Sequence, residues 1–303
     1  MTNLKELAGK INIAGSLRLS EPLKEHTSYK VGGPADLFGE PETVADVVTL
    51  LEAAAEHDLP VFVLGAGANI LVSDRGIRGM VLSTERLRSV CVDGERIVAQ
   101  AGCAISLVSE AAAAVGLSGL AFIYSMPGSV GGAVWMNARC YGSSISDVLE
   151  WVEILDENGA VVRIDVQQDQ FDYKVSPFQK RRAVILSACF RLRHGERAAI
   201  LEEMEANRAD RERKGHFAAP SAGSVFKNNR SFGNPSGKII DSLGLRGYSI
   251  GGAKISDYHA NMIINTGSAT AFDIEALTRY VARRVKDELG YELEREVIPV
   301  GDW

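Results

Sequence analysis

Residues 111–138 contain no charged side chain, and this uncharged run limits the folds that the chain can adopt. Glycines and Pro127 interrupt the run repeatedly, which makes it a poor membrane span. An uncharged segment of this kind is typical of loop backbone that is buried inside the protein. Glycine is also frequent elsewhere, at 30 of 303 residues against a usual share of about 7%. We therefore expect sharp bends, or places where the backbone approaches a ligand closely.

The composition excludes several classes of protein. Hydrophobic residues make up 46% of the chain and charged residues 24%, the balance of a soluble globular protein. The length of 303 residues suggests two domains, with one large domain or three small ones still allowed. A net charge of −6 without a Lys/Arg cluster argues against nucleic acid as a partner. The first 16 residues carry charges within their apolar stretch, unlike a signal peptide. We expect a cytoplasmic protein with no membrane partner.

Several common functional motifs are missing from the sequence. The cysteines, at positions 91, 103, 140 and 189, are too far apart for a CxxC metal motif, and we expect reduced thiols and no metal site. GNPSGKII, which begins at Gly233, has the wrong spacing for a phosphate-binding P-loop. There is no GxSxG, HExxH or EF-hand pattern either, so these hydrolase and metal chemistries lose their usual support.

Hydrophobic periodicity predicts alternating helices and strands. A short N-terminal helix is expected, and helices are predicted over residues 42–57, 105–115 and 271–289. Residues 196–214, rich in Glu, Arg and Ala, predict an exposed helix after a compact domain. Short strands after residue 61 predict a βαββ unit, Asn158 and Gly159 predict a hairpin, and residues 292–300 predict a closing strand.

Two glycine-rich loops are candidates for one shared cofactor site. GAGAN, residues 65–69, fails as a dinucleotide fingerprint because Ile70 occupies the third glycine position. Its small residues could still form a nest of backbone N–H groups for phosphate oxygens, or simply a tight turn. SMPGSVGGAVWMNA, residues 125–138, could wrap a flat ring or allow close helix packing, and its Trp135 falls in a predicted short helix.

Two further segments contain polar residues that could act in catalysis. PSAGSVFKN places Lys227 three residues after Ser224, whose hydroxyl could transfer a proton only beside a cation or carboxylate. A turn serine is the simpler interpretation. FDYKVSPF offers Tyr173 and Lys174 to an acidic substrate, and His259 lies near an apolar strand, where histidine is more often structural.

Seven motifs together resemble the UDP-N-acetylenolpyruvoylglucosamine reductase family, in order and over nearly the whole chain. They are HTSYKVGGPADLF, VLGAGANILVSD, GLSGLAFIYSMPGSVGGAVWMNA, FDYKVSPF, PSAGSVFKN, SDYHANMIIN and ELEREVIPVG. The resemblance is to the shorter family type, which lacks an extra substrate-covering loop. It implies an α+β protein with a two-subdomain FAD-binding fold of the vanillyl-alcohol-oxidase/PCMH type and a C-terminal α+β substrate-binding domain. The implied boundaries are 1–83 and 84–194 for the FAD subdomains and 195–303 for the substrate domain.

The resemblance also implies the cofactor and the residues around it. FAD would be bound noncovalently, because the histidine that carries covalent flavin in some relatives has no counterpart in GAGAN. The implied FAD-binding residues are Tyr29, Gly33, Gly65, Ala66, Gly67, Ala68, Asn69, Ser125, Pro127, Gly128, Ser129, Gly132 and Asn137.

The implied reaction is the NADPH-dependent reduction of UDP-N-acetylglucosamine enolpyruvate to UDP-N-acetylmuramate, a precursor of peptidoglycan. Charge that develops beside the substrate carboxylate needs an electrophilic partner and a proton donor. By resemblance, Ser224 is the general acid, Glu296 assists it, and Lys174 replaces the usual arginine of the family. Tyr173, Lys227, Asn228 and His259 would contact the UDP-sugar.

Two other interpretations stay open at this point. A related FAD oxidase or dehydrogenase acting on another substrate would react quickly with oxygen once reduced. A flavin-binding module without catalysis would hold a flavin that NADPH cannot bleach. The sequence does not indicate an oligomeric state.

Overall fold

The computed structural model describes residues 4–303, and their contacts divide the chain into two compact units. Unit 1 consists of the chain up to Leu19, Leu37–Ala66 and Gly79–Ala209. Unit 2 consists of Ser20–Asp36, Gly67–Arg78 and Asp210–Trp303. Two N-terminal segments therefore group with the last third of the chain. The three-domain division given above stays a prediction.

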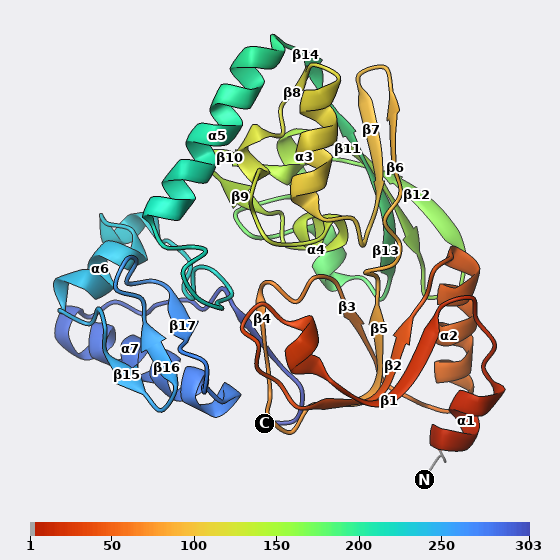
Figure 1. Cartoon of the computed structure of the whole chain (residues 1–303), viewed down its shortest axis with the longest axis horizontal. Helices are drawn as coiled ribbons and strands as arrows, with labels where there is room; N and C mark the ends of the chain where they lie inside the picture. Colours follow the sequence, from red (N-terminus) through yellow and green to blue (C-terminus); the bar gives the residue numbers. More distant parts are fainter. Residues whose placement is uncertain (1–3) are drawn as a thin grey trace. The chain divides into compact units, whose positions relative to one another are not determined.

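The largest sheet of unit 1 has five antiparallel strands in the order β12-β11-β13-β7-β6 (Figure 1). Helices α3 and α4 pack against β7, and α4 also packs against β13. Ile97, Val108 and Phe190 belong to the buried core between these elements. The bounds are β6 Val90–Asp93, β7 Arg96–Gln100, α3 Ile105–Ala114, α4 Val130–Trp135, β11 Leu149–Leu155, β12 Val161–Asp165 and β13 Val184–Arg191.

A second sheet has the strand order β1-β2-β5-β3, with β3 parallel to β5. Helix α2 buries Val47 and Leu50 in one cluster with Leu82. Thr43 and Asp46 form a capping box at the start of α2, which satisfies backbone N–H groups in its first turn. The bounds are α1 Leu4–Lys10, β1 Ser16–Pro22, β2 Pro34–Glu40, α2 Val44–Glu56, β3 Val61–Leu64 and β5 Ile77–Ser83.

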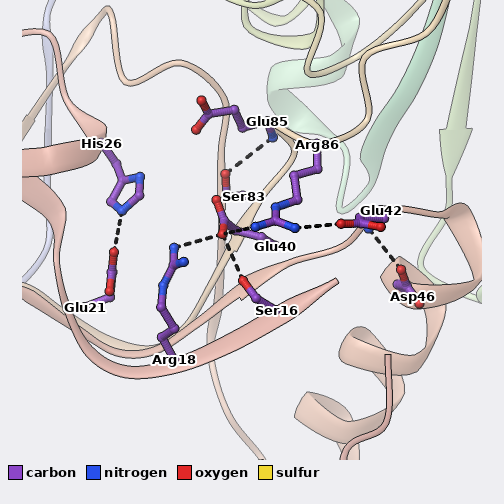
Figure 2. A network of polar contacts seen from close by, with 10 residues as sticks. All are labelled: Ser16, Arg18, Glu21, His26, Glu40, Glu42, Asp46, Ser83, Glu85 and Arg86. Carbon is purple, nitrogen blue, oxygen red and sulfur yellow. Dashed lines mark hydrogen bonds and ion pairs between the residues drawn. The ribbon is translucent and has the colours of Figure 1, made fainter. Parts of the chain in front are cut away.

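A polar network at the end of β2 surrounds the side chain of Glu40 (Figure 2). This carboxylate is buried, accepts a hydrogen bond from Ser16 Oγ at 2.9 Å, and pairs with Arg18 at 2.9 Å. Arg86 lies 3.6 Å from Glu40 and pairs with Glu42 at 2.6 Å. Two cations and a hydroxyl offset the free-energy cost of burying the Glu40 carboxylate. The network therefore joins β1, β2 and the segment after β5.

Unit 2 contains a three-stranded sheet, β15-β16-β17, packed against α7. Its core includes Ile255, Ile274 and Leu277. The carboxylate of Asp74 accepts hydrogen bonds from the first backbone N–H groups of α7, those of Ala271 at 2.9 Å and Phe272 at 3.0 Å. The bounds are β4 Ile70–Val72, α6 Ser236–Ser242, β15 Ser249–Ile250, β16 Ala253–Ile255, β17 Ile263–Asn265, α7 Ala271–Leu289 and β18 Ile298–Val300.

Most predicted elements are confirmed. Helix α7 has the predicted bounds, and α2 and α3 begin and end within two residues of theirs. Helices α1 and α4 are the short N-terminal helix and the short helix containing Trp135 that the sequence predicts. The exposed helix is α5, Arg197–Arg213, and Gly159, with φ 78°, lies in the turn between β11 and β12. None of the four cysteines, all of which are among the described residues, forms a disulfide. The remaining short strands are β8 Leu117–Ser118, β9 Arg139–Cys140, β10 Ser143–Ser144 and β14 Arg193–His194.

Two predictions about strands were wrong in part. The closing strand is confined to β18, and Arg295 forms only an isolated bridge with Phe226. β4 leaves the predicted βαββ unit and pairs in parallel with β18 instead. Its partner lies more than 200 residues away in sequence, so a local pattern could not reveal this pairing. The uncharged run is largely buried in unit 1, and every helix among the described residues is too short or too polar to span a lipid bilayer.

Candidate functional site

The two glycine-rich loops meet within unit 1. A Cβ added to Gly65 would lie 2.4 Å from Ser129 Oγ, so a larger residue at position 65 would collide with the second loop. Ser129 Oγ also accepts a hydrogen bond from Gly132 N at 3.2 Å, at the start of α4. The first residue of GAGAN therefore lies beside the SMPGS segment, and a cofactor shared by the two loops stays a prediction.

These loops present backbone N–H groups that the protein does not use. Within residues 4–303, no protein acceptor receives a hydrogen bond from the backbone N–H groups of residues 65–69, or from those of Gly128 and Ser129. Gly128 has φ 146°, a conformation confined in practice to glycine, and a Cβ there would meet nothing within 4 Å. Unbonded N–H groups and an open glycine surface suit the phosphates and the flat ring of FAD.

Two residues predicted to line the flavin, Asn137 and Ser125, make hydrogen bonds within the protein. Asn137, only 3% exposed, donates from Nδ2 to the Asp172 carbonyl at 2.9 Å and accepts from Ser146 N at 3.1 Å. Ser125 lies at φ 58°, and its N–H donates to Ser106 Oγ at 3.0 Å. The Asn137 side chain and the Ser125 N–H thus help to fix the conformation of the loop.

Tyr29 and Gly33 belong to unit 2. The Tyr29 ring is buried, and burial raises the pKa of its phenol far above its usual value, although the charge of Arg295 opposes this shift. A Cβ at Gly33 would lie 2.1 Å from the Asp74 carbonyl oxygen. Both residues therefore have clear packing roles, and their contact with FAD stays a prediction.

Ser224 lies in an extended segment held from both sides within unit 2. It forms a bridge with Met262, and the next residue, Val225, donates from N to the Asn261 carbonyl at 2.8 Å. On the other side, Glu296 N donates to the Val225 carbonyl at 2.8 Å. Ser224 Oγ has no hydrogen-bond partner among the described residues. The structure thus brings the backbones of Ser224 and Glu296 together and leaves the serine hydroxyl available.

Asn69, the last residue of GAGAN, is adjacent to Glu296. Asn69 Nδ2 donates to the Glu296 carbonyl at 3.2 Å, and Ile298 N donates to the Asn69 carbonyl at 3.1 Å. These bonds continue the parallel pairing of β4 with β18. Since its side chain binds this backbone, Asn69 would offer a cofactor its N–H group more readily than its side-chain amide.

Lys174 lies at the tip of a tight turn in unit 1. Asp172 and Val175 exchange two backbone hydrogen bonds of 3.1 and 3.0 Å around it. Lys174 has φ 60°, a conformation that costs a residue with a side chain about 1–2 kcal/mol. Gln179 Nε2 donates to the carbonyls of Lys174 and Trp135, both at 3.0 Å, which ties the turn to the end of α4. A strained turn held in this way is typical of a functional position.

The predicted substrate-binding residues are divided between the units. Tyr173 lies in unit 1, whereas Lys227, Asn228 and His259 lie in unit 2. Lys227 Nζ pairs with Glu294 at 2.6 Å, and Asn228 Oδ1 accepts from Ser236 N at 2.9 Å.

His259 has the environment of a neutral imidazole. Burial lowers its pKa, and the charges of Lys214 and Arg246 act in the same direction. Its Nδ1 accepts a weak hydrogen bond from Asn261 N at 3.3 Å, which leaves the ring proton on Nε2. His259 can therefore act as a hydrogen-bond donor to a substrate oxygen.

The sequence interpretation missed Gln179 and Asn261, whose amides fix the Lys174 turn and the Ser224 segment. Asn261 gave a usable signal, because an asparagine inside the apolar run around it needs buried hydrogen-bond partners. Gln179 gave none, since a glutamine in a polar loop is usually exposed.

Two family models match this chain. Residues 35–165 match the FAD binding domain, and residues 215–300 match the C-terminal domain of UDP-N-acetylenolpyruvoylglucosamine reductase. The first match contains both glycine-rich loops and the second contains Ser224 and Glu296.

Relatives match over nearly the full chain. UDP-N-acetylenolpyruvoylglucosamine reductase of Caldanaerobacter subterraneus subsp. tengcongensis is 42% identical over 288 residues, which are 95% of each chain. The Treponema denticola protein of the same name is 42% identical over 95% of each chain. The crystal structure of the reductase from Thermus caldophilus superimposes with a TM-score of 0.78 at 33% identity, over 95% of this chain and 99% of that one.

Proposed function

Because the chain belongs to the UDP-N-acetylenolpyruvoylglucosamine reductase family, we propose that it uses NADPH and FAD to reduce UDP-N-acetylglucosamine enolpyruvate to UDP-N-acetylmuramate. The observation that carries the proposal is the Ser224 segment. Its backbone is bonded on both sides, beside Glu296, while its hydroxyl is left without a protein partner in the described chain. We also infer the shorter family type without the extra substrate loop.

The loops that fit FAD would hold it mainly through the main chain. The N–H groups of residues 65–69 would bind its phosphates, while Gly128, Ser129 and Gly132 would lie against the ring. When bound, FAD supplies hydride transfer from NADPH to the substrate. No histidine is present in GAGAN, which supports noncovalent binding.

Ser224 would donate the proton that completes reduction of the enolpyruvyl double bond. Hydride addition at the distal carbon leaves negative charge on the carbon beside the carboxylate, and the Ser224 hydroxyl proton would go to that carbon. Glu296 would assist at the same centre. A cation near the substrate carboxylate would stabilise the charge, and Lys174 is the candidate for that role.

The family resemblance assigns four polar residues to the UDP-sugar. Tyr173, Lys227, Asn228 and His259 offer a phenol, a cation, an amide and a neutral imidazole, which suit the phosphates and sugar hydroxyls of such a substrate. Their assignment rests on the family resemblance.

An anaerobic spectral titration tests the proposal. The purified yellow protein is bleached with NADPH, UDP-N-acetylglucosamine enolpyruvate is added, and recovery of the oxidised flavin band is followed. Rapid recovery, with formation of UDP-N-acetylmuramate, is the expected result. Bleaching without recovery would reject this substrate and favour an oxidase or dehydrogenase, which rapid reaction with oxygen would then identify. A flavin that NADPH cannot bleach would indicate a binding module without catalysis.

A further inference from the structure

We propose that Asn261 is a positioning residue for Ser224, acting through the backbone of Phe226. This inference rests on the proposed function, because it concerns the proton donor of that reaction. It adds a residue with no assigned role in catalysis or substrate binding.

Asn261 makes a two-point hydrogen bond with the main chain of Phe226. Its Oδ1 accepts from Phe226 N at 2.9 Å, and its Nδ2 donates to the Phe226 carbonyl at 2.8 Å. The carbonyl oxygen of Asn261 itself accepts from Val225 N at 2.8 Å. Asn261 is 3% exposed, so water does not compete for these bonds.

Among the described residues, only the Asn261 amide bonds the main chain of Phe226 on this edge of the Ser224 segment. On the opposite edge, Lys227 N donates to the Glu294 carbonyl and Glu296 N donates to the Val225 carbonyl, each at 2.8 Å. In this antiparallel pattern the N–H and C=O of Phe226 point away from residues 294–296. The Asn261 amide forms hydrogen bonds with this N–H and this C=O, as the backbone peptide of a neighbouring strand would.

The backbone pairing around the Ser224–Met262 bridge stops at Asn261, because the chain turns at that point. Met262 N donates to the His259 carbonyl at 2.9 Å, which closes a turn just before the bridge. No backbone remains to pair with Phe226, and the asparagine side chain takes its place. We call the two hydrogen bonds between the Asn261 amide and the Phe226 main chain the Asn261 clamp. Because Ser224 is only two residues from Phe226, a shift of Phe226 would move the Ser224 hydroxyl.

Loss of the clamp should slow proton transfer selectively. Without the amide, the buried N–H and C=O of Phe226 have no partners, and the segment would shift to satisfy them. A misplacement of about 1 Å at a reacting group costs roughly 100-fold in rate. We therefore expect Asn261→Ala to slow substrate reduction by about 10- to 100-fold, with flavin reduction by NADPH within about twofold of wild type.

The experiment compares Asn261→Ala and Asn261→Asp with Val281→Ala in the holoenzyme. Val281 is a buried core residue of α7 in the same unit and has no bond to the Ser224 segment. Its truncation therefore serves as a control for lost stability alone. Both half-reactions are measured by anaerobic stopped flow, the second also in D₂O, and hydrogen exchange is followed in the peptide that contains Phe226.

Three results support the proposal together. Both Asn261 variants slow the second half-reaction, its solvent deuterium isotope effect rises, and exchange at Phe226 accelerates. In Val281→Ala, a similar loss of melting temperature leaves both rates unchanged. Asn261→Asp retains the acceptor for Phe226 N but loses the donor to the Phe226 carbonyl, and it still tests the proposal if Asn261→Ala does not fold.

The proposal is overturned if the Asn261 variants slow the second half-reaction no more than Val281→Ala does, or if Phe226 exchange is unchanged. Failure of the proposed function gives a different result, since wild-type enzyme would then bleach without recovering upon addition of the enolpyruvyl substrate. In that case the exchange measurement alone decides whether Asn261 holds the segment.

Discussion

The glycine-rich loops and the Ser224 segment use the backbone in opposite ways. In the loops, the N–H groups of residues 65–69, Gly128 and Ser129 have no protein acceptor among the described residues, whereas Ser129 and Asn137 bind the protein through their side chains. In the Ser224 segment, the backbone of residues 225–227 is bonded on both edges and the Ser224 hydroxyl is unbonded.

This difference matches two kinds of chemistry. A large cofactor can be held by many weak donors along a main chain, and glycine keeps those donors accessible. A proton donor needs one side-chain atom in a fixed place, so its backbone must be rigid. The comparison predicts that substitutions in the loops affect FAD affinity, whereas substitutions around Ser224 affect the rate of one half-reaction.

The largest expected effect is that of Ser224→Ala. Loss of a general acid typically costs 100- to 10,000-fold in rate, so substrate reduction should slow by roughly that factor. FAD affinity and flavin reduction by NADPH should stay close to wild type, because the backbone is unchanged. Single-turnover kinetics of the two half-reactions check this. Normal substrate reduction in the variant would show that Ser224 is not the proton donor.

Substitutions of Lys174 test whether the positive charge on this strained turn contributes to substrate reduction. Lys174→Ala removes the ammonium group and should lower kcat/KM by about 10- to 100-fold, as expected for lost hydrogen bonds to a charged group. Lys174→Arg keeps the positive charge and does not alter the backbone freedom at this position, so kcat/KM should stay within a few-fold of the wild-type value. Equal behaviour of the two variants in steady-state kinetics would mean that charge at this position is irrelevant.

Gly128→Ala tests the loop side of the comparison. A Cβ would meet no atom, but φ 146° is strained for alanine by about 1–3 kcal/mol. The loop should relax away from this conformation, and FAD should bind roughly 10- to 100-fold more weakly. Titration of apoprotein with FAD measures this effect. Gly142→Ala, another open glycine of unit 1 at positive φ, serves as the control and should bind FAD normally.

The sequence predicted local features better than long-range ones. The bounds of α7 followed from its apolar face and from Gly290 at its end, since both signals lie within the helix itself. The residues alone made the two loops candidates for a cofactor site, but only the family motifs assigned roles to Ser224 and Glu296, because a serine in a small-residue loop is usually a turn residue. The pairing of β4 with β18 and the amide bonds of Asn261 depend on contacts between distant segments, which no local pattern encodes.

His216 makes unit 2 sensitive to acid, whereas the glycine-rich loops contain no histidine. Burial, followed by the charge of Arg211, lowers the pKa of His216 to about 4. The unfolded chain therefore binds more protons between pH 4 and about 6.5, so stability is full above pH 6.5 and falls as the pH drops toward 4. Because the ring is only partly buried, we expect a loss of about 1–2 kcal/mol, below the full linkage value.

Urea unfolding of wild type and His216→Gln at pH 4.5 and 7 checks this expectation. The variant should lose less stability on acidification than wild type. His57→Gln, a change at an exposed residue of unit 1, should follow wild type. An identical loss in all three proteins would assign the acid sensitivity to other groups.

The smallest expected effect concerns Glu294, which holds Lys227 at 2.6 Å and is 70% exposed. If Lys227 binds a substrate phosphate, Glu294 competes for the same cation, and Glu294→Gln should lower KM by about two- to fivefold at low salt, the range of an exposed ion pair. The rate constant kcat should not change, because the proton donor is untouched. The difference in KM should shrink at high ionic strength, where the Debye length is only about 3 Å.

The control is Glu292→Gln, which removes the same charge from an exposed pair with Lys286 and should leave KM unchanged. If both variants lowered KM equally, net charge rather than Lys227 would govern substrate binding, and Lys227 would no longer belong with the residues that act around Ser224.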